Sequence, residues 1–168
     1  MSEGSPTSAE LLLLLSAAPR SLARLTRGLP AGHLNTRPSP RVWSANDVLA
    51  HLRSCADVWG DYIVTMAAED RVSLRRISPR TWIKRTNYPE LGFGRSLRAF
   101  TAQRADLLAT LEPLSPEGWA HVATLTRGGV SRQRSVQDIA RGLATHEQEH
   151  LLQIERIARR ARVAGATS

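Results

Sequence analysis

Hydrophobic residues recur at spacings of three and four in four separate segments of the chain, which is the period of an amphipathic α-helix. The first segment covers about residues 8–27, and Thr7 with Glu10 forms a T-x-x-E capping box at its start. Pro19 lies inside this segment and lacks the N–H that a helix interior needs, so we expect a break or a kink there. Gly28 is a suitable residue to end the helix.

The second segment has a well-defined start. Ser44 is the expected N-cap and Asp47 the third helical residue, and Trp43 can pack on Val48 as a hydrophobic staple. One face of the segment is marked by regularly spaced apolar residues: Val48, Leu52, Cys55, Trp59, Tyr62 and Met66. This spacing predicts a long helix that buries that face.

Two further helices are predicted beyond long connections. The third helix spans about residues 96–111, and the fourth begins after Ser135, with Asp138 in another S-x-x-D start, and runs to about Val163. The connection over about residues 69–94 is rich in Arg, Pro and aromatic residues, and a connection of this length in a small bundle usually crosses it or shapes a site. The connection before the fourth helix includes a short strand-like piece.

Four amphipathic helices without convincing strand pairs predict an all-α fold, a four-helix bundle. The two long connections indicate that it is not a plain up-down-up-down array. A chain of 168 residues suits one domain with one core. We therefore predict a single domain over residues 1–168, with its core at about residues 8–163.

The net charge is strongly basic, with 23 Lys and Arg against 15 Asp and Glu. A nucleic-acid-binding surface needs clustered basic residues, whereas these are scattered apart from one pair and one loose group. The pair is Arg159 with Arg160, and the group contains Arg71, Arg75, Arg76, Arg80 and Arg85. Composition therefore does not favour a nucleic-acid partner.

The single cysteine, Cys55, allows no internal disulfide and is compatible with a reducing compartment. The leucine run at residues 11–15 follows Glu3 and Glu10 and no basic residue, so it lacks the positive region of a signal peptide. The run is also too short to cross a bilayer. We interpret it as part of a core helix and expect a cytoplasmic protein without a membrane partner.

The stretch HEQEH, residues 146–150, carries the main candidate chemistry. It fits both H-E-x-x-H and the inverted H-x-x-E-H of zinc enzymes. A helix turns about 100° per residue, so His146 and His150 lie one turn apart at one edge of the buried stripe, where two imidazoles can reach one metal ion. His51 lies at the corresponding edge of the second helix. Three neutral imidazoles would leave one or more coordination positions open, as a catalytic metal centre needs.

The two alternatives to this metal site are packed core histidines and a metalloprotease. A single histidine near an apolar face is usually a packed core residue, but a pair one turn apart with a third on a neighbouring helix favours a metal. In H-E-x-x-H proteases a third ligand usually follows downstream, yet no histidine follows His150 and Glu155 points away. The sequence therefore disfavours a metalloprotease, while His33 and His121 fit no ligand spacing.

The two glutamates of HEQEH are expected to differ, because Glu147 falls within the buried stripe and Glu149 faces solvent. A buried carboxylate needs a partner. Glu147 is a candidate base, a candidate hydrogen-bond partner of a ligand histidine, or half of an ion pair with Arg104 from the apolar stripe of the third helix. Cys55, one turn after His51, is a packing residue or a fourth ligand.

Several stretches resemble the DinB/YfiT-like superfamily, the DinB-like domain of metal-dependent four-helix-bundle proteins. WSANDVLAHL resembles the start of its second helix, and FGRSLRAFTAQRADLLATLEPL with the later GWAHV resembles its third helix and the Trp that follows. THEQEHLLQI resembles the H-x-x-x-H of its last helix. With LARLTRGLP near the N-terminus, the likeness covers nearly the whole chain, although His121 stands where an arginine is often found.

The resemblance implies an up-down-down-up bundle, often a homodimer. It also implies a divalent metal ion, commonly zinc or nickel, held by three histidines, which by position are His51, His146 and His150. Some members of the superfamily are metal-dependent S-transferases that use a low-molecular-weight thiol, some are thiol-dependent isomerases, and a few hydrolyse amides. The fold alone does not choose among these chemistries.

We therefore expect a metal-dependent enzyme that acts on a small-molecule substrate, first of all a thiol-dependent S-transferase. A metal-dependent hydrolase and a non-catalytic, stress-related bundle that binds a metal or a ligand are the alternatives. Glu147 is the candidate catalytic residue, and Arg104 with Arg53 are candidates to orient an anionic thiol cofactor by their charge.

Overall fold

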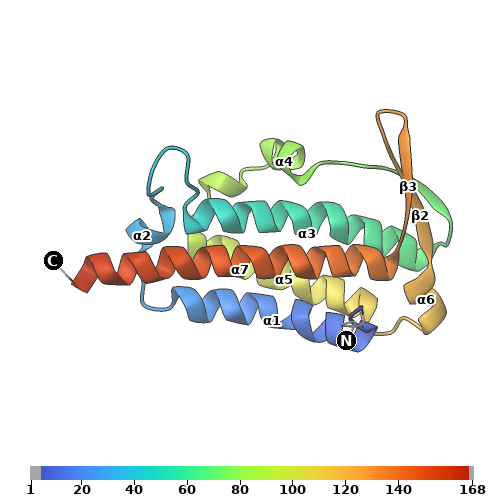
Figure 1. Cartoon of the computed structure of the whole chain (residues 1–168), viewed down its shortest axis with the longest axis horizontal. Helices are drawn as coiled ribbons and strands as arrows, with labels where there is room; N and C mark the ends of the chain where they lie inside the picture. Colours follow the sequence, from blue (N-terminus) through green and yellow to red (C-terminus); the bar gives the residue numbers. More distant parts are fainter. Residues whose placement is uncertain (1–4, 167–168) are drawn as a thin grey trace.

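A computed structural model of the chain describes residues 5–166, and four long helices lie side by side in it (Figure 1). The helices are α1 (Ser8–Thr26), α3 (Ala45–Ala68), α5 (Phe93–Leu111) and α7 (Val136–Ala166). The helices α3 and α5 run in one direction, and α1 and α7 run in the other (Figure 1). The predicted four-helix bundle with up-down-down-up order is therefore confirmed.

The helix starts follow the local signals in the sequence. Thr7 with Glu10 caps α1, and Ser44 with Asp47 caps α3, each through reciprocal hydrogen bonds between side chain and backbone. These boxes satisfy N–H groups that have no partner within the helix. A break or a kink was expected at Pro19; the break is wrong, because α1 continues through Pro19 to Thr26, and the kink stays a prediction.

The two long connections contain a three-stranded sheet that the hydrophobic pattern did not predict. Its strands are β1 (Val72–Arg75), β2 (Val122–Arg127) and β3 (Val130–Ser135), in the order β1-β2-β3. The pair β1–β2 is parallel and the pair β2–β3 is an antiparallel hairpin, which stands across one end of the bundle (Figure 1). The hairpin turns at Gly128 and Gly129, whose φ angles of +56° and +79° suit glycine.

Short helical turns complete the connections. They are α2 (Ala31–Asn35), α4 (Pro79–Trp82), η1 (Ile83–Arg85), η2 (Tyr88–Glu90) and α6 (Pro116–Ala120). One carboxylate of α3 fixes the segment that contains α4, because the Trp82 indole N–H and the Tyr88 hydroxyl both donate to Asp57 Oδ2, at 2.9 and 2.8 Å. The connection is therefore held against α3.

The interior of the bundle contains two apolar clusters. One lies toward the sheet and includes Leu15, Ile63 and Leu143, and the other lies toward α2 and includes Leu49 and Phe100. Buried polar side chains also lie on α3 and α7, among them His51 and Glu147, whereas His146 and His150 are half-buried. Within the described residues, none of the helices is both long and apolar enough to cross a membrane.

Candidate metal centre

The structure brings His51 of α3 together with His146 and His150 of α7. The Nε2 atom of His146 lies 3.3 Å from that of His51 and 3.2 Å from that of His150. The rings of His51 and His150 have their centroids 5.1 Å apart, and His51 is only 5% exposed. We call these three residues the histidine cluster. These are the three side chains that the sequence predicts as metal ligands, and their role as ligands stays a prediction.

The spacing of these nitrogens suits a shared metal ion. Two nitrogen ligands at the usual zinc distance, in a tetrahedral arrangement, lie about 3.3–3.4 Å apart. The two measured Nε2–Nε2 distances, 3.3 and 3.2 Å, are close to that value. A single N–H on the central ring, His146, can satisfy one neighbour only, whereas one cation can accept a lone pair from each ring.

Protonation also favours a cation in this cluster. Burial, together with the charges of the neighbouring histidines, lowers the pKa of His51 and of His146 to about 4, and burial lowers the pKa of His150. The rings are therefore neutral at pH 7, as metal ligands must be. His150 Nδ1 lies 2.8 Å from Gln153 Oε1, an acceptor, so the proton sits on Nδ1 and the Nε2 lone pair faces the cluster.

Cys55 adds a sulfur atom on the buried side of the histidine cluster. Its Sγ lies 3.6 Å from His51 Nε2, and ligand atoms of His51, Cys55 and His146 all lie within 4.8 Å of one another. Burial raises the pKa of the Cys55 thiol to about 12. The thiol is therefore neutral at pH 7, and it becomes a ligand only if a metal displaces its proton.

Two tryptophans and an arginine surround the histidine cluster. The Trp43 ring stacks on His150 with an interplanar angle of 17°, and the Trp59 ring meets His146 edge-on. Arg80 of α4 lies over Trp43, and its charge lowers the pKa of all three histidines. Sequence reasoning missed these positions, because Trp43 and Trp59 fit a helical staple and a helical face equally well and Arg80 lies in an irregular connection.

Glu147 follows His146 in α7 but faces another helix. It forms an ion pair with Arg104 of α5, and the two side chains are 1% and 2% exposed. Burial raises the pKa of Glu147 to about 7, and the Arg104 charge opposes this rise. Arg53, the other arginine considered for a cofactor, is also buried and stacks on the Tyr88 ring at 3.6 Å. The structure thus places both arginines in the interior of the bundle.

Comparisons with known proteins agree with this fold. A family model described as the DinB superfamily matches residues 14–154. Among solved structures, the chain is similar to YfiT from Bacillus subtilis, described as a probable metal-dependent hydrolase with an unusual four-helix bundle topology. The TM-score is 0.79 at 14% identity, over 95% of this chain and 91% of that one, so the likeness shows the fold. No curated protein matches the chain.

Proposed function

The chain belongs to the DinB superfamily, and we propose that it is a metal-dependent enzyme that transfers a low-molecular-weight thiol to a small electrophile. In this proposal His51, His146 and His150 hold a divalent ion, zinc or nickel. The observation that supports it is that the Nε2 atom of His146 lies 3.3 Å from that of His51 and 3.2 Å from that of His150. A divalent ion held by three imidazoles keeps a coordination position open and lowers the pKa of a thiol or water bound there.

The surrounding side chains suit an anionic nucleophile. The ligands are neutral imidazoles, so the centre keeps its full positive charge, and Arg80 adds another positive charge nearby. Trp43 and Trp59 provide flat apolar walls beside His150 and His146. Such a site stabilises a thiolate and offers a surface for an apolar or aromatic electrophile.

The position of Glu147 favours thiol transfer over hydrolysis. A hydrolytic site of the H-E-x-x-H kind uses its glutamate to take a proton from water. Here Glu147 is buried and paired with Arg104. A thiol is far more acidic than water and needs no such base once the metal has lowered its pKa. Hydrolysis is the second candidate, because YfiT is described as a probable metal-dependent hydrolase.

Metal content tests the core of this proposal. We expect protein purified without a histidine tag and incubated with zinc or nickel to retain about one ion per chain. His146→Ala should lose this ion, whereas His33→Ala, which removes an exposed histidine of α2, should keep it. A wild-type protein that retains no stoichiometric metal contradicts the proposal.

Activity separates the candidate functions. Metal-loaded protein is assayed with bacillithiol, mycothiol and glutathione as thiols and a small electrophile as acceptor, in parallel with amide and ester substrates. We expect thiol transfer that His146→Ala abolishes. Cleavage of the amide or ester without thiol would favour the hydrolase, and metal binding without either activity would favour a non-catalytic bundle.

A further inference from the structure

The β2–β3 hairpin carries two arginines on the face that it turns toward the bundle. Arg132 lies opposite Leu125, and Arg134 lies opposite Ala123. Residues directly opposite in an antiparallel pair share one face of the sheet. Leu125 and Ala123 are buried against the helices. The two arginines are therefore attached to the face of the hairpin that is turned toward the bundle. That position is unusual for charged residues, and the hydrophobic pattern does not explain it.

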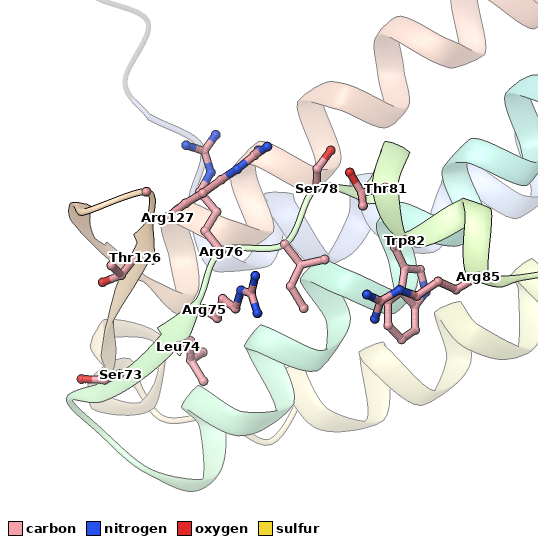
Figure 2. A pocket seen from close by; sticks show the side chains of 12 residues that line it. Ser73, Leu74, Arg75, Arg76, Ser78, Thr81, Trp82, Arg85, Thr126 and Arg127 are labelled. Atoms are coloured by element: carbon pink, nitrogen blue, oxygen red, sulfur yellow. The ribbon is translucent and has the colours of Figure 1, made fainter.

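These arginines line a hollow of about 530 Å³, together with Arg76 and Arg127. We call it the arginine hollow. Its volume lies in the range of small-molecule sites. Arg76 and Arg127 also line a second hollow of about 610 Å³, which shares the 76–78 segment with the first. Figure 2 shows their side chains extending in the same direction, whereas Arg75 points elsewhere.

The positive charges of the arginine hollow have little compensation from the protein. None of the ion pairs found among residues 5–166 involves Arg76, Arg127, Arg132 or Arg134. The carboxylate in the lining, Asp138, accepts from the Ser135 N–H and from Arg141, and its charge offsets part of that of Arg134. Four guanidinium groups around one hollow create a strong positive potential, which an anionic ligand with several oxygens would neutralise.

The backbone that carries Arg76 is held on two sides. Its own N–H donates to Thr126 O at 2.9 Å, which extends the β1–β2 pairing. The next N–H, that of Ile77, donates to the Tyr62 hydroxyl at 2.6 Å, and this hydroxyl donates to Arg75 O at 3.1 Å. Tyr62 of α3 therefore fixes the segment. The backbone of Arg76 is thus ordered before a ligand binds, which lowers the entropic cost of binding.

The arginine hollow and the histidine cluster share one neighbouring side chain, that of Trp59. Trp59 lines the hollow, and its ring meets the His146 ring with centroids 5.2 Å apart. Gly142 also lines it, one helical turn before His146 in α7. The hollow and the histidine cluster are therefore neighbours, with the Trp59 ring between them.

From these observations we propose that the arginine hollow binds a small molecule with two or more carboxylate or phosphate groups, whose reactive end reaches the histidine cluster. The second half of this inference rests on the proposed function, whereas anion binding in the hollow does not. The anionic molecule is either the thiol or its electrophilic partner, since both can carry such groups. A nucleic-acid strand is a poorer fit, because it needs basic residues along an open surface.

The test is calorimetric titration of metal-free protein with pyrophosphate and with citrate. The key variant is Arg132→Gln with Arg134→Gln, two exposed positions on an edge strand where substitution leaves the fold intact, as circular dichroism checks. The control is Arg20→Gln with Arg24→Gln, which removes the same charge from exposed positions of α1. We expect wild type and control to bind both anions and the hairpin variant to bind at least about tenfold more weakly.

The same titration on His146→Ala separates the two proposals. If this variant binds pyrophosphate normally while wild type retains no metal, the arginine hollow stands and the proposed function fails. If wild type retains metal but binds neither anion, only the proposed anion site in the arginine hollow is contradicted.

Two other results overturn the anion site. Equal anion affinity in the hairpin and control variants excludes it. If the hairpin variant then self-associates, the arginines protect the β3 edge from pairing with another chain. A single-stranded oligonucleotide that displaces pyrophosphate at lower concentration than citrate does would indicate a nucleic-acid partner instead.

Discussion

His146 and Glu147 are consecutive residues of α7, yet they belong to two very different buried polar groups. His146 lies between two other neutral imidazoles, and its Nε2 atom is 3.3 Å from that of His51 and 3.2 Å from that of His150. Glu147 pairs with Arg104 between α7 and α5, sealed from solvent. The neutral imidazoles offer lone pairs that a cation can accept, whereas the ion pair supplies its own counter-charge. Burial alone therefore does not identify a functional residue, and a buried charge that has its counter-charge within the fold needs no ligand.

The largest expected effect is on the ion pair. Arg104→Met leaves Glu147 buried without its counter-charge, which should lower the free energy of unfolding by about 3–5 kcal/mol. Urea denaturation monitored by circular dichroism measures this loss. Adding Glu147→Leu removes the unpaired carboxylate and should restore most of the stability, because replacing both members of a buried pair with apolar groups is often neutral.

The double variant also tests whether Glu147 is a base. We expect Arg104→Met with Glu147→Leu to retain its metal and to keep thiol transfer within about tenfold of wild type. Loss of a general base costs roughly a hundredfold to ten-thousandfold in rate. A loss of that size with normal metal content would show that Glu147 takes part in catalysis. It would contradict the assignment of Glu147 as a structural ion-pair partner.

The second effect concerns the histidine cluster and depends on metal. Zinc in hundredfold excess over its dissociation constant should stabilise wild type by about 2.7 kcal/mol, because the ion binds the folded chain. In His146→Ala this zinc-dependent gain should disappear. Thermal unfolding with and without zinc measures it, with His33→Ala as the control. An equal gain in all three proteins would place the metal elsewhere.

The third effect is a pH dependence of the metal-free protein. The folded-state pKa of His51 and of His146 is about 4, below the ordinary value near 6.5. Between these values the unfolded chain binds more protons, so stability should fall as the pH falls from about 6.5 to 4. Denaturant titrations at several pH values measure the slope. His146→Ala should show a shallower slope than wild type, and equal slopes would contradict the assigned cause.

The sequence predicted those features of the two buried polar groups that depend on the helical period. The capping boxes at Thr7 and Ser44 fixed the start of two helices, and a period of 3.6 residues placed His146 at the edge of the core and Glu147 within it. The same period could not decide whether Glu147 is a catalytic base or the ion-pair partner of Arg104. The direction of a side chain on one helix does not show which residue of another helix lies opposite.

Pairing between distant segments could not be predicted in the same way. The four-residue strand β1 gains its structure from β2, which follows much later in the chain, and β3 has no alternating apolar pattern. The sequence pattern therefore did not indicate that Arg132 and Arg134 lie on one face of a sheet. The continuity of α1 through Pro19 was missed for a related reason, since packing of the buried proline outweighs one lost hydrogen bond.

The smallest expected effect concerns Cys55, which lies on the buried side of the histidine cluster. If three imidazoles are the ligands, Cys55→Ala should cost about 1 kcal/mol of stability, as a small core truncation does. Zinc affinity, measured by competition with a chelator, should then change by less than about tenfold, since no ligand is lost. A much larger loss of affinity, with His150→Ala nearly unchanged, would make the thiol a ligand in place of His150. The centre would then differ less from the ion pair, because a thiolate ligand supplies part of the counter-charge of the metal.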